Sequence, residues 1–409
     1  MKLKQTLSLL MTTALLAGCL NNLDKEITNK PEVGPDEVVV QTTKSQLGSE
    51  NYRAVITDGK YALGASASID SYLSSSGNAK AFEEGLLAIS KSVFPTDQYF
   101  LKEGQLIDES TMTSWVSRES ELYPEGLNPP APTAPTPPAS ENPEQAESQQ
   151  EGENAESNEQ VTSEANSQVI LDRSAAPIYL AQIMEKDIMV ETADGYALAG
   201  IVIGLAMNSE YQYTDENGVS YNQEISLGEM RERGKAYANT IVGRLRNTEQ
   251  LRSVPIVVGI FRQAPSRDVV GGVYVMDGIS REGNSVADWT EHNENRVSLP
   301  LVNSSESIDQ YQFFYDFRNH VVNFFPNLNG ITGQALYVEG RLASIDIEIV
   351  TQFYQKTEVT ALTQHVLDMA QSYLPTGIPI EIKIESGAGI EAYVGRPAGA
   401  THYQSHVFH

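Results

Sequence analysis

The 409-residue sequence contains a single cysteine, Cys19. One cysteine cannot form a disulfide within the chain, and it excludes a zinc or iron–sulfur centre built from several thiolates. A long apolar run is also missing. The charge-free run from Thr6 to Gly18 would span only about 20 Å as a helix, whereas a bilayer's hydrocarbon core is about 30 Å thick. We therefore interpret this run as a targeting segment that does not span the membrane.

Basic residues are scarce as well. The 28 lysines and arginines are outnumbered by 54 aspartates and glutamates, and the formal net charge is −26. Because binding to nucleic acid and to anionic lipid surfaces depends on clustered positive charge, this balance argues against both as partners, apart from a lipid anchor. The composition instead fits a soluble domain with an ordinary hydrophobic core.

The position of Cys19 explains why the chain keeps one cysteine. Lys2 and Lys4 precede the apolar run, and Leu16, Ala17 and Gly18 lead into Cys19. This is the layout of a bacterial lipobox, in which the residues before the cysteine are recognised by the signal peptidase and the cysteine sulfur accepts a diacylglyceryl group. Two acyl chains suffice for stable attachment to a bilayer. The alternative is an ordinary signal peptide that happens to end at a cysteine.

From the lipobox we predict a lipid-anchored protein on the extracellular face of the cell membrane. Its partners would be the lipid bilayer, through the anchor on Cys19, and the lipoprotein-processing enzymes. Composition and periodicity divide the rest of the chain. We predict a signal peptide over 1–18, a flexible tether over 19–50, an N-terminal folded segment over 51–125, a disordered acidic, proline-rich linker over 126–168, and a main α+β domain over 169–409.

Hydrophobic periodicity predicts an α+β (or α/β) fold, a mixed β-sheet with helices packed on it. We expect helices over 80–95, 177–187, 226–247, 304–326 and 356–375. We expect strands within 99–107 (as a short pair), 196–207, 254–263, 271–278, 334–353, 379–386 and 390–395. Ser226 and Glu229 have the spacing of a capping box.

Several segments resemble one known family. The stretches "ENYRAVI", "GLNP", "PIYLAQIMEKD", "VPIVVGIFRQ" and "DWTEHNENR", in this order behind a lipobox, are similar to the CamS sex-pheromone lipoprotein family of Gram-positive bacteria. The resemblance implies a lipid-anchored surface protein whose released signal peptide yields, in some members, a short apolar peptide that acts as a mating pheromone. It implies no agreed activity for the folded part.

The richest polar cluster is "DWTEHNENR", which contains Asp288, Trp289, His292 and Asn293. A histidine beside carboxylates is the usual arrangement of a general base. A hydrated loop over a buried tryptophan explains the same residues without chemistry. Two hypotheses therefore stand for the folded part: a non-catalytic module that binds a partner or peptide, and an unrecognised envelope hydrolase that uses His292 with a nearby carboxylate.

Other candidate groups favour structure over chemistry. His402, His406 and His409 could hold a metal on a helix, but "HVFH" is predicted as a strand, in which His406 and His409 would point to opposite faces, so we expect no metal site there. Two carboxylate pairs, Asp346 with Glu348 and Glu381 with Glu385, fit the solvated faces of half-exposed strands. We find no P-loop, dinucleotide fingerprint, nucleophile elbow or zincin helix. We therefore predict no catalytic residue, no metal and no cofactor, and the sequence names no partner for the folded part.

Overall fold

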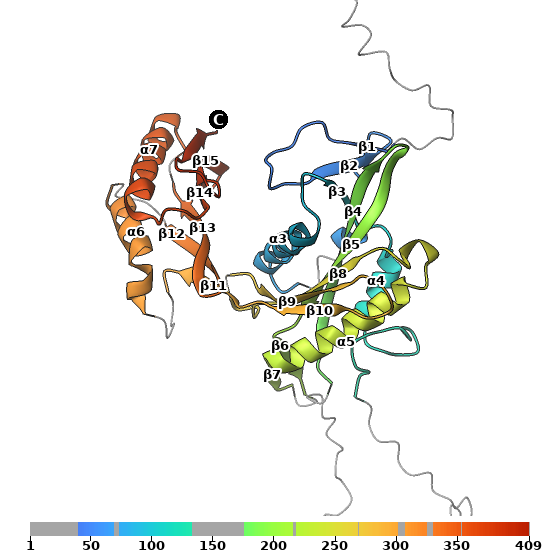
Figure 1. The fold of residues 1–409 in the computed structure, drawn as a ribbon. Helices are drawn as coiled ribbons and strands as arrows, with labels where there is room; N and C mark the ends of the chain where they lie inside the picture. Colours follow the sequence, from blue (N-terminus) through green and yellow to red (C-terminus); the bar gives the residue numbers. More distant parts are fainter. Residues whose placement is uncertain are drawn as a thin grey trace, which may run out of the picture.

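A computed structural model of the chain describes residues 40–68, 73–132, 176–215, 218–268, 270–301, 307–324, 330–352 and 354–408. These residues form two bodies, each a β-sheet with helices packed on it (Figure 1). The predicted α+β class is confirmed. Cys19, the residues before it and most of the predicted linker lie outside the described residues, as does His409.

The larger body contains a sheet of eight strands. In spatial order they are β1 (Val40–Thr42), β2 (Arg53–Thr57), β3 (Tyr99–Glu103), β4 (Leu180–Thr192), β5 (Gly195–Met207), β8 (Ile256–Arg262), β9 (Val273–Ser280) and β10 (Ala287–Glu291). Strands β2 and β3 are parallel, as are β5 and β8, and the other neighbours are antiparallel. A hairpin of β6 (Glu210–Thr214) and β7 (Ser220–Glu224) follows β5.

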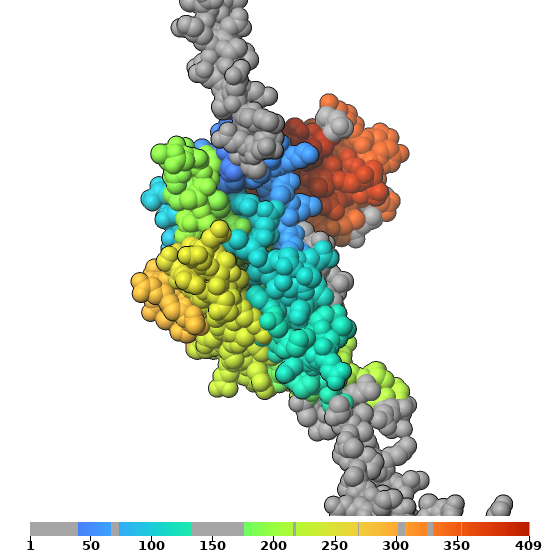
Figure 2. Space-filling model, turned by 90° about the vertical axis from the view of Figure 1, so that its right-hand side faces the viewer, coloured from blue at the N-terminus to red at the C-terminus, as the bar shows by residue number. Residues whose placement is uncertain are grey.

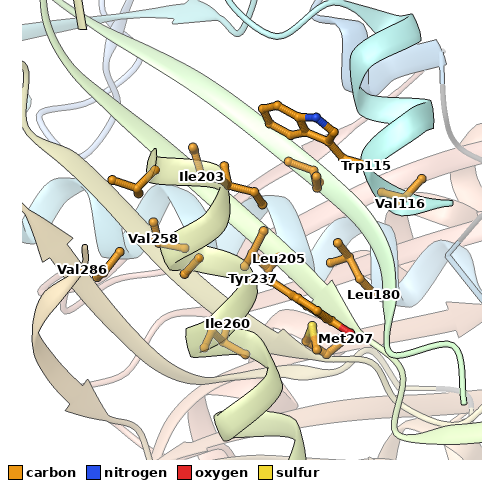
Figure 3. Close-up of a cluster of buried hydrophobic side chains, with 14 of the residues drawn as sticks. Trp115, Val116, Leu180, Ile203, Leu205, Met207, Tyr237, Val258, Ile260 and Val286 are labelled. Atoms are coloured by element: carbon orange, nitrogen blue, oxygen red, sulfur yellow. The ribbon is translucent and has the colours of Figure 1, made fainter. Parts of the chain in front are cut away.

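Helices cover both faces of this sheet. Helix α3 (Ser76–Val93) packs on one face, while α4 (Glu109–Val116) and α5 (Leu227–Leu245) pack on the other. Figure 3 shows the second layer, in which Tyr237 of α5 lies beside Leu205 and Met207 of β5, while Trp115 of α4 belongs to the same core cluster. Because both faces are buried, β5 consists almost entirely of apolar residues and glycine.

The helices begin and end where their side chains dictate. The Ser75 hydroxyl accepts a hydrogen bond from the Asn78 N–H at the start of α3, which ends just before Pro95. At the start of α5, the Ser226 hydroxyl accepts from the Glu229 N–H at 3.2 Å. The predicted apolar stripe of α5 is buried, as expected: Met230, Tyr237, Ile241 and Leu245.

The smaller body contains a six-stranded sheet. Its strands are, in order, β11 (Glu294–Leu299), β12 (Gly330–Val338), β13 (Arg341–Val350), β14 (Ile380–Ser386), β15 (Gly389–Arg396) and β16 (Gln404–Val407). Helices α6 (Gln312–Phe324) and α7 (Lys356–Tyr373) cover one face, over a core that includes Ile345, Ile347 and Ile349. In Figure 2 this body, coloured orange to red, projects from one side of the larger one. Nowhere in the described ranges does a helix combine the length and apolarity that crossing a membrane requires.

The helix predicted over 177–187 is wrong, because these residues enter β4 instead. β4 runs for 13 residues beside β5 in the middle of the sheet. From Leu180 to Ile188 nearly all its residues are buried, on both faces, including the charged Glu185, Lys186 and Asp187. A strand covered on both sides does not alternate between apolar and polar positions, so its short apolar run has the appearance of a buried helix.

Three predicted boundaries also need correction. Residues 40–42 of the predicted tether form β1 and pair with β2. Residues 126–132 of the predicted linker are folded, and Asn128 is buried, its amide bonded to the backbone of Val116, Tyr179 and Leu180. The strand pair over 99–107 is a single strand, β3, after which the Gly104 N–H bonds the Glu185 carbonyl. The segments predicted as 51–125 and 169–409 thus share one sheet.

A buried acidic pair lies on β4. Glu185 and Asp187 are 0% and 1% exposed, and the Glu185 carboxylate accepts hydrogen bonds from the N–H groups of Leu106 (3.2 Å) and Ile107 (3.0 Å). The Asp187 Oδ1 atom is buried and has no hydrogen-bond partner among the residues that the structure describes. Burial, and next the charge of Asp187, raise the pKa of Glu185 to about 8, and burial raises the pKa of Asp187 to about 6. The pair therefore retains a proton near neutral pH.

This pair makes stability depend on pH. A carboxyl whose pKa is higher in the folded state stabilises the fold fully below its unfolded pKa, and the contribution is lost as pH rises through the folded pKa. We therefore expect the melting temperature of the wild type to fall between about pH 4 and pH 8, by the equivalent of about 1.4 kcal/mol for each unit of pKa difference. Glu185→Gln should flatten this dependence, because an amide cannot ionise and can donate to Asp187.

Glu191→Gln is the matched control, because Glu191 lies on the same strand but is exposed. It should leave the pH dependence as in the wild type. If thermal melts show equal slopes for Glu185→Gln and the wild type, the buried pair is not the cause.

Candidate functional site

His292 has a carboxylate partner, as the hydrolase hypothesis requires. Its Nε2 atom lies 2.5 Å from Oδ1 of Asp277. Asp277 belongs to β9, and His292 directly follows the neighbouring strand β10. The hydrogen bond with Asp277 raises the pKa of His292, against the opposing effect of burial. No serine, threonine or cysteine in the described ranges bonds to His292. The pair thus supplies a base and a carboxylate but no nucleophile.

The other residues of the predicted cluster do not converge on His292. The segment is not a hydrated loop, because it contains β10 and β11, with His292 and Asn293 as the link between the two bodies. Asp288 is exposed in a bulge of β10 with φ of +48°. Trp289 is half-buried against the larger core, with the Lys235 ammonium 5.7 Å from its ring. The Asn293 carbonyl accepts from the Glu339 N–H at 2.9 Å.

A second candidate site lies between the two bodies. The face of the smaller sheet opposite α6 and α7 is turned toward α3, as Figure 1 shows, and the two enclose a cleft of about 570 Å³. We call this the interbody cleft. Its charged lining residues come from α3, β11, β13 and β14: Lys80, Glu84, Arg296, Asp346, Glu348, Glu381 and Lys383.

Strand pairing gathers these charges. β13 and β14 are parallel, with Asp346 opposite Glu381 and Glu348 opposite Lys383. Neighbouring strands lie about 4.8 Å apart, so the two carboxylates of the first pair are held close together on the cleft face. Ile345 and Ile347 point the other way, into the core under α6 and α7.

The charges of the interbody cleft are largely unpaired. Within the described part of the chain, the only ion pair between two of them joins Lys80 and Glu84, at 3.6 Å on α3 itself. Burial raises the pKa of Glu84, with Lys80 and Arg296 opposing and the charge of Asp346 adding to the effect. Because both walls carry charges of both signs, a ligand with both charge signs would find partners on each of them.

The sequence analysis placed Asp346 and Glu348 on one strand face but assigned them to solvent, and it did not single out Arg296 or Lys383. The alternation of "SIDIEIV" was a sufficient signal for the face. The pairing of β13 with β14 and the position of α3 decide which element this face meets. Both depend on residues far apart in the sequence. His406, one of the C-terminal histidines, lies on β16 opposite Tyr393 of β15, and so on a different sheet from Asp288 and Trp289 of β10.

Comparison with known proteins identifies the family. The model of the family described as "CamS sex pheromone cAM373 precursor" matches residues 61–145 and 139–402. The chain belongs to the CamS family. The resemblance found in the sequence is therefore confirmed, and it extends over both bodies and the interbody cleft. No curated protein matches the chain.

Two solved structures of CamS-type proteins share the fold. A crystal structure of a sex pheromone precursor from Lactobacillus salivarius subsp. salivarius UCC118 is 33% identical, covers 91% of this chain and 99% of its own, and has a TM-score of 0.74. A structure of the C-terminal domain of the sex pheromone staph-cAM373 precursor from Staphylococcus aureus is 25% identical, covers 83% of this chain and 98% of its own, and has a TM-score of 0.62.

The contact between His292 and Asp277 predicts a measurable titration. Because the hydrogen bond favours the imidazolium, Asp277→Asn should lower the pKa of His292, as followed by NMR of its ring protons. The ion pair contributes stability below the unfolded pKa of histidine, and this contribution is lost as pH rises through the raised pKa. Asp288→Asn is the matched control and should leave the His292 titration in place. An unchanged titration in Asp277→Asn would show that the two side chains do not interact in solution.

Proposed function

We propose that this CamS-family chain is a lipoprotein of the cell surface, attached through a diacylglyceryl group on Cys19, whose folded part is a non-catalytic binding module. The lipobox ending at Leu16, Ala17, Gly18 and Cys19 supports the anchor, and membership of a family of pheromone precursors supports an extracellular location. The bilayer and the lipoprotein-processing enzymes are its proposed partners. The cleaved signal fragment is the proposed source of a short apolar peptide.

The binding module would use the interbody cleft. The observation that carries this proposal is the set of charges of both signs in the cleft between α3 and the sheet face that α6 and α7 leave uncovered. A structural role would pair Asp346 and Glu381 with cations, whereas each instead has a carboxylate as its register partner. Arg296 is held by a bond from its Nε to the Gly272 carbonyl at 3.2 Å, which fixes its position on the cleft wall.

A peptide segment that carries both a basic and an acidic side chain fits this lining best. Its cation would lie between Asp346 and Glu381, where it would relieve their mutual repulsion, and its carboxylate would face Arg296 or Lys383. Binding is favoured over catalysis because the one base and carboxylate pair, His292 with Asp277, lies apart from the cleft lining. The interbody cleft therefore gives the hydrolase hypothesis no support.

The cleft is tested with charged peptides and the soluble chain that carries Cys19→Ala. We expect peptides with both charge signs to bind, and the double variant Asp346→Asn with Glu381→Gln to weaken binding about tenfold or more, since a hydrogen bond to a charged group contributes about 1.5–3 kcal/mol. Calorimetry or fluorescence anisotropy measures the affinity, which should fall as salt rises.

Asp368→Asn on α7 is the control for this experiment, because it removes an exposed carboxylate on the opposite face of the same sheet. It should bind as the wild type does. Equal affinity of the double variant and the control for every bound peptide would place the binding surface elsewhere.

The anchor and the released peptide are tested together in cells. Mass spectrometry of the membrane fraction should find diacylglyceryl-modified Cys19, and the culture supernatant should contain a short peptide ending at Ala17 or Gly18. Cys19→Ala should release the protein from the membrane and abolish both species, because the lipid acceptor is gone. Firm membrane association of Cys19→Ala would contradict the anchor. Synthetic peptides with these ends, applied to responsive donor cells and scored for clumping, test the pheromone role separately.

A further inference from the structure

A second cavity, of about 600 Å³, lies in the larger body where β5 and β8 end. Asn208 and Ser209 follow β5, and Gln263 follows β8, so the carboxyl ends of two parallel strands deliver all three to its wall. In open sheets with parallel strands, ligands bind in the crevice outside these ends. We call this cavity the amide pocket. Its lining shares no residue with the interbody cleft.

The amides of the pocket are fixed in place. The Gln263 Nε2 donates to Asn208 Oδ1 at 2.9 Å, and the Gln263 Oε1 accepts from the N–H and the hydroxyl of Ser74, at 3.0 and 3.2 Å. Asn208 Nδ2 donates in turn to the Ile178 carbonyl at 2.9 Å. A polar wall held in this way keeps its shape without a ligand, which reduces the entropy lost on binding.

One buried hydroxyl of this wall, that of Ser209, is not hydrogen-bonded by any described residue. Ser209 is 3% exposed and lines the pocket. A buried hydroxyl without a partner destabilises a fold, and the carbonyl and N–H groups of a folded chain usually satisfy such a hydroxyl. A ligand that offers a hydrogen bond at this position would remove the cost.

The pocket needs no charged ligand. Its two charged side chains, Arg118 and Glu210, both have partners within the protein. Arg118 donates to the carbonyls of Pro129 and Ala176, each at 2.8 Å, and Glu210 accepts from the amide of Asn222 at 2.7 Å. The other polar lining groups, among them Ser74, Tyr123, Asn208, Ser209 and Gln263, are neutral hydroxyls and amides.

We propose that the amide pocket binds a neutral saccharide unit of the N-acetylhexosamine type. Hydroxyls and amides both donate and accept hydrogen bonds, as sugar hydroxyls do. The ring of Tyr123 offers an apolar face to a sugar ring, and Val116 and Ile178 offer an apolar surface to an acetyl methyl group.

The test uses the Cys19→Ala chain and the β-1,4-linked disaccharide of N-acetylglucosamine as the probe. Calorimetry should show binding to the wild-type pocket. Ser209→Ala should weaken it about five- to tenfold, because the hydrogen bond to the ligand is lost. The same variant should melt at the wild-type temperature or above, because its hydroxyl has no partner in the free protein. Ser266→Ala removes a hydroxyl at an exposed position of the same lining, and it should also weaken binding of the disaccharide.

Ser372→Ala on α7 and the cleft variant Asp346→Asn with Glu381→Gln are the controls, and both should bind the disaccharide as the wild type does. The proposal is overturned if no binding is detected at millimolar disaccharide, or if Ser209→Ala and Ser266→Ala bind as tightly as Ser372→Ala. Displacement of the disaccharide by the charged peptides of the cleft experiment would also overturn it. Failure here leaves the interbody cleft unaffected, because the two linings are separate.

Discussion

The structure depends on how closely α3 approaches the larger sheet. The Phe82 ring lies over Gly204 of β5, where an added Cβ would be 2.7 Å from the ring. The Tyr274 ring lies similarly close to Gly85 of α3, where an added Cβ would also clash with it. The Tyr274 hydroxyl donates to the Phe82 carbonyl at 2.9 Å, so ring packing and a hydrogen bond fix the same contact. Any side chain at Gly204 or Gly85 would push helix and sheet apart.

The position of α3 decides both candidate sites. Its amino end is held by Asn78, whose side-chain Oδ1 accepts from the N–H groups of Ala264 and Gly272 at 2.9 and 2.8 Å. Ser74, just before the helix, bonds Gln263 in the amide pocket, while Lys80 and Glu84, one and two turns along, face the interbody cleft. The core contact over Gly204 therefore sets the geometry of two polar surfaces that it does not touch.

Local signals predicted what local physics determines. The capping serine and apolar stripe of α5, the end of α3 before Pro95 and the buried strand β5 follow from residues close in sequence. The failures occurred where distant residues decide. β4 has the appearance of a helix because its neighbours bury both faces, and β1 has the appearance of a tether because its pairing with β2 lies outside any local window.

The candidate sites show the same division. His292 was expected to find a carboxylate, but its partner, Asp277, lies on the preceding strand 15 residues away and could not be singled out. The amide pocket was not anticipated at all, because Asn208, Ser209 and Gln263 carry no motif and meet only through the parallel pairing of β5 with β8. Residues that follow strand ends are the signal that could have found them.

The charges of the interbody cleft oppose the stability of the sheet that carries them. Like charges directly opposite each other on neighbouring strands are destabilising, and Asp346 and Glu381 are such a pair. Solvent screening keeps the cost small at half-exposed positions, but no described cation offsets it within ion-pair distance. The hydrophobic core beneath, built from Ile345, Ile347 and Ile382, does not need these carboxylates, since the opposite strand face holds it together. The cation of the proposed peptide ligand would relieve this repulsion without any change in the core beneath it.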